Sequence, residues 1–425
     1  MSMYIIEGGR PISGKIKASG NKNAALPCIA ASLLTSESIT LSNVPDIEDV
    51  HVMLEIYRTL GGTAEEIAHN CWKLNGANIK SCAIPEVLAE KIRASILFAG
   101  PLVARTGQAV LPPPGGDVIG RRRLDTHFLA LTLLGAKVRV NGVYEFKAKK
   151  LSGADIFLDE ASVTATENAV MAAVFASGET VVTNAACEPH VQDLCRMLNL
   201  MGAKITGVGS NILHITGVKK LGGCEFQLGA DFMEVGSFLG LAAATRGELE
   251  IEGVLASEIR PAKIAFGKLG VSWEHSEKTI YISKKQQLKV NNDIGGMIPK
   301  IDDAPWPGFP PDLTSIITVL ATQVEGTCLI HEKMFESRMF FVDMLIGMGA
   351  RIVLCDPHRA VISGPAELTA SVLTSPDVRA GMAMVIAAMC AKGKSVIRNV
   401  YQIERGYENI IKRLTAIGAK IDRAE

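Results

Sequence analysis

One short pattern recurs six times along the chain, at intervals of about 70 residues. It is a polar turn followed by a run of β-forming residues. The copies are ESITLSNV from Glu37, TGQAVLPP from Thr106, GETVVTNA from Gly178, GELEIEGV from Gly247, EGTCLIHE from Glu325 and GKSVIRNV from Gly393. A second marker keeps the same interval: LGG at Leu60, LGA at Leu134, MGA at Met201, LGV at Leu269, MGA at Met348 and IGA at Ile417. Two independent markers with one period predict six copies of a structural unit, grouped as two similar halves of three.

Each unit reads as a helix, a strand, a second helix, a glycine turn and a further strand. The glycine of the second marker suits the left-handed position that follows a helix. The helix before each marker strand is apolar or small nearly all round, which is typical of a helix buried on every side. Examples are NAALPCIAASLL, ENAVMAAVFA, EVGSFLGLAAAT, LTSIITVLAT and RAGMAMVIAAMCA. We therefore expect an α/β chain with helices at the centre of each half.

The N-terminal flanks of these apolar helices are polar: SGNKN, DEASVTATEN, PPD and SPDVR. Helix N-termini carry free N–H groups and a partial positive charge, so N-termini gathered at one surface favour anions. For any single flank, ordinary N-capping by Ser, Asp and Asn is the simpler explanation. Lys and Arg at several of the same ends favour the anion-binding interpretation.

Composition excludes several classes of protein. The 425 residues suggest two or three domains, and the 44 basic and 44 acidic residues argue against a general nucleic-acid or membrane-surface binder. The first residues lack the pattern of a signal peptide, and no run of 18 apolar residues occurs. The nine cysteines form no CxxC pair and no zinc pattern, which is typical of reduced thiols. We expect a cytoplasmic protein without metal or cofactor.

Seven motifs together resemble the UDP-N-acetylglucosamine 1-carboxyvinyltransferase family of enolpyruvyl transferases. They are SGNKNAALP (19–27), KIRASILFAGPLVAR (91–105), PGGDVIG (114–120), FPPD (309–312), FESR (335–338), DVRAG (377–381) and ERGYENI (404–410). The resemblance implies two inside-out α/β barrel (β-prism-like) domains of three repeats each, with the active site in the cleft between them. It implies domain I at 21–231, with a mobile lid at about 110–123, and domain II at 1–20 and 232–425.

The implied reaction transfers the enolpyruvyl group of phosphoenolpyruvate to the 3-hydroxyl of UDP-N-acetylglucosamine, through a tetrahedral intermediate and with release of phosphate. It is the first committed step of peptidoglycan precursor synthesis. Phosphoenolpyruvate carries a phosphate and a carboxylate, so its site needs fixed cations. By resemblance these are Lys22, Arg122 and Arg405, with Arg93, Arg338 and Arg379 around the phosphate. A single Arg in a helix is more often a solvated residue, so these assignments depend on the shared motifs.

Asp117, in the glycine-rich lid, is the expected general acid toward the methylene carbon. Most members of the family carry Cys here, and a minority carry Asp. The alternative is an ordinary turn Asp beside glycine. An aspartic acid loses its proton at a lower pH than a thiol, so we expect turnover to peak at lower pH than in Cys-type relatives. A carboxylate is also a poorer nucleophile toward an epoxide, so we expect resistance to fosfomycin, which alkylates the thiolate.

Asp312 follows a proline-rich approach and is expected both to cap the helix LTSIITVLA and to accept the proton of the sugar hydroxyl. The resemblance thus gives catalytic roles to Asp117, Asp312, Lys22 and Arg405. Asp377 is expected to assist proton movement. Residues that match UDP-sugar contacts are Asn23, Arg123, Leu124, Asp125, Thr126, Ser162, Val163 and Thr164.

The chain departs from the family pattern around the nucleotide. Arg123 replaces a Pro that lies beside the uracil, and Glu160 stands where many members have Lys. Leu97 and Phe232 replace a common Trp and Arg. These departures bear on the acceptor more than on phosphoenolpyruvate. The alternatives are a paralogue that acts on another UDP-sugar, a nucleotide or shikimate 3-phosphate, and a non-catalytic protein of the same fold. The expected partners are small molecules, without nucleic acid or membrane, and the sequence does not give the oligomeric state.

Overall fold

The computed structural model describes residues 2–117 and 119–425. The described chain divides into two units, each with its own hydrophobic core. Unit 1 contains residues 2–19, 119–122 and 230–425, and unit 2 contains residues 20–117 and 123–229. The expected domains change at 20/21 and at 231/232, and they place the whole lid in domain I. In the structure residues 119–122 group with unit 1 instead, because they contact the FESR segment there.

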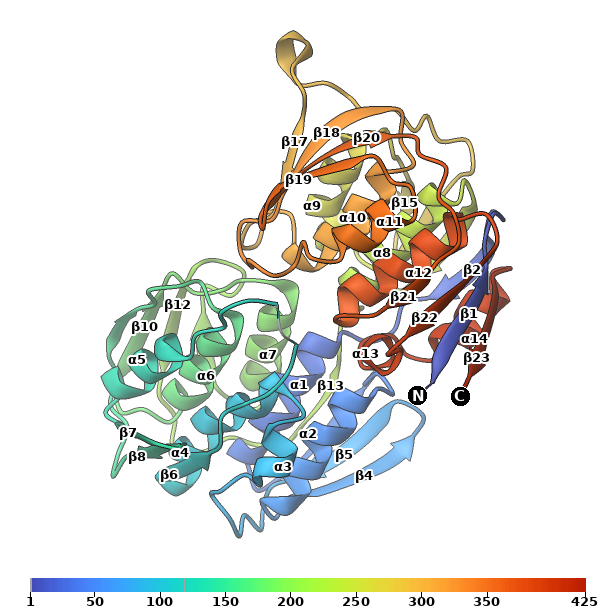
Figure 1. Cartoon of the computed structure of the whole chain (residues 1–425). Coiled ribbons are helices and arrows are strands. Elements are labelled where there is room, and N and C mark those ends of the chain that lie inside the picture. Colours follow the sequence, from blue (N-terminus) through green and yellow to red (C-terminus); the bar gives the residue numbers. More distant parts are fainter. Residues whose placement is uncertain (1, 118) are drawn as a thin grey trace. The chain divides into compact units, whose positions relative to one another are not determined.

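The strands of residues 2–117 and 119–425 form six small sheets, three in each unit. In unit 1 the strand orders are β21-β22-β1-β23, β15-β16-β14-β2 and β17-β18-β20-β19. The bounds are β1 (Met3–Glu7), β2 (Ser13–Lys17), β14 (Glu248–Glu252), β15 (Glu274–Ser276), β16 (Thr279–Ile282), β17 (Lys300–Asp302), β18 (Gly326–His331), β19 (Ile352–Asp356), β20 (Arg359–Gly364), β21 (Val372–Thr374), β22 (Lys394–Arg398) and β23 (Lys420–Ala424). The N-terminal strand β1 lies between β22 and β23, so both ends of the chain share one sheet (Figure 1).

Unit 2 has the strand orders β13-β3-β5-β4, β6-β8-β7 and β11-β12-β10-β9. The bounds are β3 (Ser38–Ser42), β4 (Thr63–Ala68), β5 (Cys71–Asn75), β6 (Gln108–Leu111), β7 (Lys137–Asn141), β8 (Val143–Lys147), β9 (Asp155–Phe157), β10 (Glu179–Thr183), β11 (Lys204–Thr206), β12 (Ile212–Thr216) and β13 (Cys224–Gln227). The marker strands β3, β6, β10, β14, β18 and β22 therefore fall one to a sheet. The predicted arrangement of three repeats in each half is confirmed.

The marker glycines also behave as predicted. Each ends a helix with a positive φ of 75° to 106°, at Gly61, Gly135, Gly202, Gly270, Gly349 and Gly418. The single strand predicted after each glycine is wrong for five repeats, where a short antiparallel hairpin follows instead. Strands of three to six residues carry too little periodic pattern to be counted separately. In the sixth repeat one strand, β23, follows the glycine, and β1 pairs with it.

Helices fill the centre of each unit. In unit 1 they are α8 (Phe232–Ala244), α9 (Ala256–Gly267), η3 (Ile294–Gly296), η4 (Pro311–Leu313), α10 (Thr314–Ala321), α11 (Val342–Gly347), α12 (Val378–Cys390), α13 (Tyr401–Glu404) and α14 (Ile410–Ala416). Every residue of α8 and α10 is buried, as is α12 up to Met389. The prediction of helices buried on all sides is confirmed, and their Ala and Gly content permits close helix contact.

In unit 2 the helices are α1 (Lys22–Ala31), η1 (Ser32–Leu34), α2 (Glu48–Thr59), α3 (Glu86–Ala89), η2 (Arg93–Phe98), α4 (Ala99–Thr106), α5 (Asp125–Leu133), α6 (Val163–Ala173) and α7 (Pro189–Leu200). The central helices here are α1, α4 and α6. Gly100 of α4 shows how close they approach: a Cβ on it would lie 2.6 Å from the backbone oxygen of Asn168 in α6. None of the helices in the described ranges is long and apolar enough to cross a membrane.

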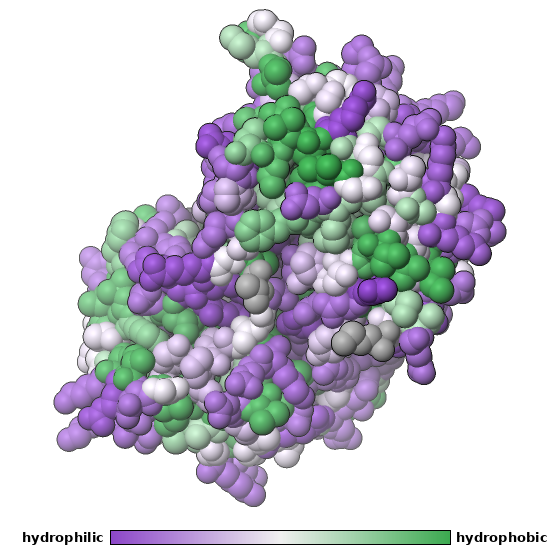
Figure 2. Space-filling model, viewed as in Figure 1, coloured by the Kyte–Doolittle hydropathy of each residue, from purple (hydrophilic) through white to green (hydrophobic). Residues whose placement is uncertain are grey.

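The surface of unit 1 carries one projecting apolar loop, residues 291–298, visible above its sheets in Figures 1 and 2. Ile294 at its centre is 99% exposed, and Met297 and Ile298 are also exposed. Elsewhere on the face shown in Figure 2, polar side chains separate further apolar patches.

Candidate active site

The N-termini of the central helices of unit 1 meet at one cluster of charged side chains. Asp231 caps α8 by accepting hydrogen bonds from the N–H groups of Met233 and Glu234. Asp377 caps α12 in the same way, through the N–H groups of Arg379 and Ala380. The expectation that these helix ends share a surface is thus confirmed within unit 1. Aspartate caps and basic side chains occur together at these helix ends.

Asp312 lies between two buried arginines. Its Oδ1 accepts a hydrogen bond from Nη2 of Arg338 at 2.5 Å, and its Oδ2 accepts one from Nε of Arg379 at 3.1 Å. Arg379 also reaches within 3.9 Å of Asp231. The expected helix cap is wrong: the residue before α10 is Leu313, and that helix has no side-chain cap. The carboxylate of Asp312 does not cap backbone N–H groups of α10. It is held by two charge-assisted hydrogen bonds instead.

The two arginines remain charged although they are buried. Burial alone would lower the pKa of Arg338, but the charges of Asp312 and Asp377 outweigh it and raise the pKa. The pKa of Arg379 is raised as well, because contacts with Tyr407, Asp312 and Asp231 outweigh its burial. Nε of Arg338 and Nη1 of Arg379 are buried and find no acceptor among the described residues. Buried guanidinium donors are normally paired, so this cluster has unused capacity to bind an anion.

Glu332 completes the cluster of unit 1, and sequence reasoning missed it. Burial, followed by a hydrogen bond with Asp303, raises its pKa to about 9. Oε2 of Glu332 and Oδ2 of Asp303 are both buried without a donor in the described chain. A proton held by Glu332 satisfies both oxygens, so we describe Glu332 as neutral. No local sequence signal marks this residue.

Arg405 belongs to the same unit and closes the short helix α13. It is 5% exposed, and its Nη1 donates to Gln402 at 2.8 Å. Tyr407, two residues later, lies under the guanidinium of Arg379 at 5.2 Å and shares a hydrogen bond of 2.8 Å with Ser237 of α8. The ERGY motif therefore supports the arginine cluster through its tyrosine.

In unit 2 the first expected cation, Lys22, is the first residue of α1. Its Nζ lies 2.9 Å from Oδ2 of Asp49, and both side chains are largely buried. Asn21 caps the helix by accepting from the N–H of Asn23. Asp49 lies in the first turn of α2. Sequence reasoning missed it because an acidic residue in DIEDV is typical of an ordinary helix start. It fixes the direction of the Lys22 side chain.

The segment after the lid is held by a carboxylate that the sequence did not single out. Arg123 donates through Nε to Asp125 at 2.9 Å and through Nη2 to Asp159 at 3.2 Å. The hydroxyl of Thr126 donates to the other oxygen of Asp159 at 2.8 Å. Arg93 donates to the backbone oxygen of Arg123 at 3.0 Å. Arg123, where this segment departs from the family pattern, thus shares Asp159 with Thr126.

The other expected nucleotide contacts lie at the N-terminus of α6. Ser162 is its N-cap and accepts from the N–H of Ala165. Val163 and Thr164 form the first turn, and Thr164 contacts His127 of α5 at 3.0 Å. Leu124 is buried just before α5. The structure brings the first turns of α5 and α6 together, so Asp125, Thr126, Ser162 and Thr164 form one set.

The lid has no regular secondary structure from Pro112 to Asp117, and Val118 within it lies outside the described residues. In unit 2 Gly116, with φ of 101°, passes so close to Arg93 that a Cβ would lie 2.9 Å from the arginine Cβ. In unit 1 the N–H of Arg121 donates to Glu336 at 2.8 Å. Asp117 is half-buried and groups with unit 2, whereas Arg122 groups with unit 1.

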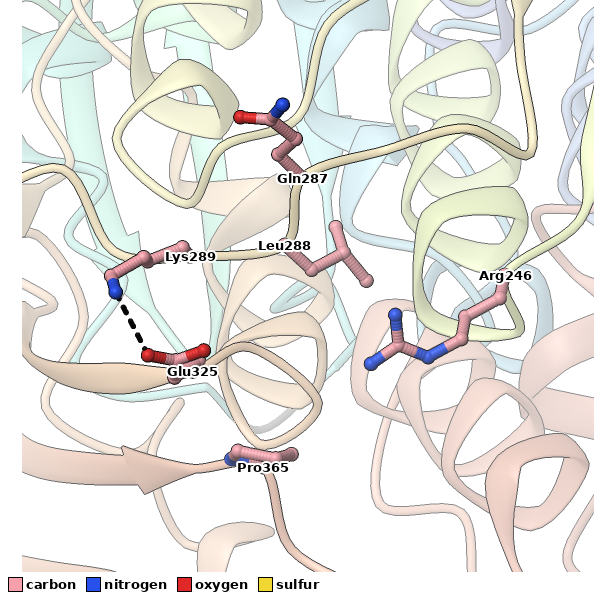
Figure 3. Close-up of a pocket in the computed structure, with 6 residues that line it drawn as sticks. All are labelled: Arg246, Gln287, Leu288, Lys289, Glu325 and Pro365. Carbon is pink, nitrogen blue, oxygen red and sulfur yellow. Dashed lines mark ion pairs between the residues drawn. The ribbon is translucent and has the colours of Figure 1, made fainter.

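A cavity of about 410 Å³ lies elsewhere in unit 1 (Figure 3). Lys289 and Glu325 form an exposed ion pair of 2.9 Å on one side, and Arg246 faces it from beyond the end of α8. No expected site residue lines this cavity. Among the described residues, no group of three or more His, Cys, Asp or Glu side chains is arranged to hold a metal ion.

Comparison with known proteins identifies the family. The model of the EPSP synthase (3-phosphoshikimate 1-carboxyvinyltransferase) family matches residues 6–414. The chain is 69% identical over 425 residues to the UDP-N-acetylglucosamine 1-carboxyvinyltransferase of Treponema denticola, with both chains covered completely. It is 65% identical over 421 residues to the enzyme of the same name from Treponema pallidum, with 99% of each chain covered.

Solved structures show the same fold. The enolpyruvyl transferase NikO from Streptomyces tendae aligns with a TM-score of 0.87 at 22% identity, over 100% of this chain and 99% of that one. An EPSP synthase from Acinetobacter baumannii aligns with a TM-score of 0.76 at 18% identity, over the full length of both chains. These likenesses confirm the predicted fold class. The full-length identity to the named relatives decides the narrower grouping: the chain belongs to the UDP-N-acetylglucosamine 1-carboxyvinyltransferase family, within the larger family of enolpyruvyl transferases.

Proposed function

We propose that the chain transfers the enolpyruvyl group of phosphoenolpyruvate to the 3-hydroxyl of UDP-N-acetylglucosamine and releases inorganic phosphate. Relatives that carry this activity in their name match it over their full length at up to 69% identity. The structural observation that carries the proposal is the pair of buried guanidinium nitrogens, on Arg338 and Arg379, that lack an acceptor in the described chain. They flank Asp312 and suit a dianionic phosphate.

The roles follow from the chemistry of the addition. The sugar hydroxyl adds its oxygen to C2 of phosphoenolpyruvate and gives its proton to Asp312. A carboxylate oxygen has two lone pairs, so Asp312 can accept a proton while Arg338 and Arg379 remain bonded. The methylene carbon C3 takes a proton from Asp117. The tetrahedral intermediate then loses phosphate from C2 and a proton from C3, which restores the double bond.

The cations act by binding and by stabilising charge. Lys22, directed by Asp49, adds a point charge at the N-terminus of α1. The anionic groups of the two substrates are bound by Arg93, Arg122 and Arg405. Asp377 assists proton movement. The first turns of α5 and α6, the segment just before α5 and the start of α1 bind the nucleotide part. The residues are Asn23, Arg123, Leu124, Asp125, Thr126, Ser162, Val163 and Thr164. We propose that both sets of residues act on the same pair of substrates, so that fixed charges stabilise the intermediate.

We also propose that the enzyme works in the cytoplasm, at the start of peptidoglycan precursor synthesis. All nine cysteines are free thiols in the described ranges, and burial raises the pKa of six of them, Cys28 and Cys195 included. Inert, reduced thiols suit a reducing compartment.

A phosphate-release assay with a panel of acceptors tests the proposal. Phosphoenolpyruvate is supplied with UDP-N-acetylglucosamine, UDP-glucose, uridine or shikimate 3-phosphate. Release with UDP-N-acetylglucosamine alone is the expected result. Faster release with another acceptor would identify a paralogue, and no release with any of them would contradict a catalytic role.

A further inference from the structure

A buried chain of hydrogen bonds with one fixed direction ends at Thr164. It begins at Asn168 of α6, which is fully buried. Its Oδ1 accepts from the N–H of Gly100 at 2.7 Å, and its Nδ2 donates to the backbone oxygen of Ile96 at 2.9 Å. A backbone N–H can only donate and a carbonyl oxygen can only accept, so these two bonds settle which end of the Asn168 amide is oxygen and which is nitrogen.

The second N–H of the Asn168 amide points to His127. Nδ2 lies 2.9 Å from Nδ1 of His127, and the other N–H of that amide serves Ile96. Nδ1 must therefore accept. Burial, followed by the charge of Arg93, lowers the pKa of His127 to about 3, so the ring is neutral. A neutral imidazole that accepts at Nδ1 carries its hydrogen on Nε2.

The direction of the last bond follows. Nε2 of His127 lies 3.0 Å from Oγ1 of Thr164, so the imidazole donates and the threonine oxygen accepts. The hydrogen of the Thr164 hydroxyl is then available, and the described residues offer it no acceptor. Thr164 is half-buried in the first turn of α6, at the positive end of an 11-residue helix. A hydroxyl that already accepts from a neighbour is a polarised donor.

We propose that the Thr164 hydroxyl donates to a diphosphate oxygen of the UDP-sugar, and that His127 and Asn168 are positioning residues which fix its direction. The inference rests on the proposed function. It specifies the direction of one hydrogen bond: the protein donates and the UDP-sugar accepts. An ionised phosphate oxygen only accepts, so it complements a hydroxyl that is restricted to donating. The same restriction disfavours an acceptor substrate that presents an amide N–H, which can only donate, at this point.

Steady-state kinetics with phosphate release test the contact. Thr164→Val keeps the shape and removes the hydroxyl, and we expect KM for UDP-N-acetylglucosamine to rise about tenfold or more, the effect of losing one hydrogen bond to a charged group. The changes in kcat and in KM for phosphoenolpyruvate should stay below about threefold. Thr164→Ser should restore the wild-type KM. Thr132→Val, an exposed threonine on α5, is the matched control.

Asn168→Asp tests the direction of the chain. An aspartate accepts from Gly100 and has no hydrogen for His127, so the imidazole should move its hydrogen to Nδ1. Nε2 then accepts from Thr164, whose hydroxyl no longer points to the substrate. We expect the same rise in KM as for Thr164→Val, and no further rise in the double variant. Equal additive effects would contradict a shared mechanism.

Nitrogen NMR of the histidine-labelled full chain gives a readout independent of turnover. We expect the Nε2–H tautomer of His127 in the wild type and in Thr164→Val, and neutrality from pH 5 to 8. The Nδ1–H tautomer, or an unchanged KM in Thr164→Val, would overturn the inference even if Asn168→Asp failed to fold. A wild type that releases no phosphate with UDP-N-acetylglucosamine refutes the proposed function and the diphosphate contact with it, while the tautomer measurement still decides the positioning roles.

Discussion

Nε of Arg379 lies 3.1 Å from Oδ2 of Asp312, which ties the first turn of α12 to the turn that precedes α10. Both groups are held by central helices of unit 1, so the carboxylate sits on a rigid support. Arg338 holds its other oxygen at 2.5 Å. Opposite charges favour the ionised form of a carboxyl group, which is the form that accepts a proton.

Asp312→Asn removes that proton acceptor while keeping the volume of the side chain. We expect kcat to fall at least about 100-fold, because a positioned general base contributes roughly 10²–10⁴. Phosphate release under saturating substrates is the measurement. Asp302→Asn, which alters a carboxylate paired with Lys300 and Lys333 in the same unit, is the control and should stay near wild type. An Asp312→Asn enzyme that keeps more than a tenth of the wild-type kcat would exclude the base role.

Asp117→Cys should make the enzyme sensitive to fosfomycin, as expected for Cys-type relatives. A thiolate attacks an epoxide more readily than a carboxylate does, so we expect time-dependent loss of activity with fosfomycin in the variant and none in the wild type. Peptide mass spectrometry should locate the adduct at position 117. The wild type carries nine other cysteines and is its own control for stray alkylation. Irreversible inactivation of the wild type at low fosfomycin would contradict the prediction.

The same pair of enzymes tests the acid role by pH. A carboxylic acid loses its proton at lower pH than a thiol, so the wild-type rate should fall on the alkaline side earlier than that of Asp117→Cys. The measurement is kcat against pH for both proteins in one buffer series. Superimposable profiles would mean that position 117 does not supply the proton.

Glu332 predicts how stability depends on pH. Its pKa in the folded chain is about 9, against 4.5 for an ordinary glutamate, because it is buried beside Asp303. The folded state therefore keeps a proton that the unfolded chain releases. The stability from this group is complete below pH 4.5 and is lost as pH rises through about 9.

Glu332→Gln keeps a donor toward Asp303 and removes the titration. We expect the wild type to lose thermal stability relative to this variant as pH rises from 5.5 to 8.5. The measurement is the difference between their Tm values across that range. Glu325→Gln, an exposed glutamate of the same unit, should give a constant difference. A constant difference for Glu332→Gln as well would show that Glu332 is already ionised.

Sequence reasoning succeeded where the signal is local and repeated. The marker glycines and the Ala-rich helices depend on neighbours within one turn, and the structure confirms both. Six copies of the same local signal also gave the number of repeats. The hairpins were missed because their strands are too short to show alternation.

The charged contacts were not predictable in the same way. Asp312 reads as a helix cap from its neighbours, but Arg338 and Arg379, 26 and 67 residues away, take its oxygens. Asp159 meets Arg123 across 36 residues, and Asn168 meets His127 across 41. No local pattern encodes such pairs. The residues that carry the family motifs were found, and those that orient them were not.

Close contact between central helices predicts that Gly100 tolerates no side chain. A Cβ there would lie 2.6 Å from the backbone oxygen and 2.8 Å from Oδ1 of Asn168, and a backbone oxygen inside a packed helix cannot move aside cheaply. We expect Gly100→Ala to destabilise the protein by about 1–3 kcal/mol, which lowers Tm by several degrees. Gly347→Ala, at the exposed end of α11 where a Cβ meets nothing within 4 Å, should be neutral or raise Tm slightly. Thermal unfolding followed by circular dichroism compares the two. If both substitutions shifted Tm alike, the close approach of α4 to α6 would not explain the effect of Gly100→Ala. The side chain of Asn168 would then have free space around it, which is inconsistent with the hydrogen-bond chain to Thr164.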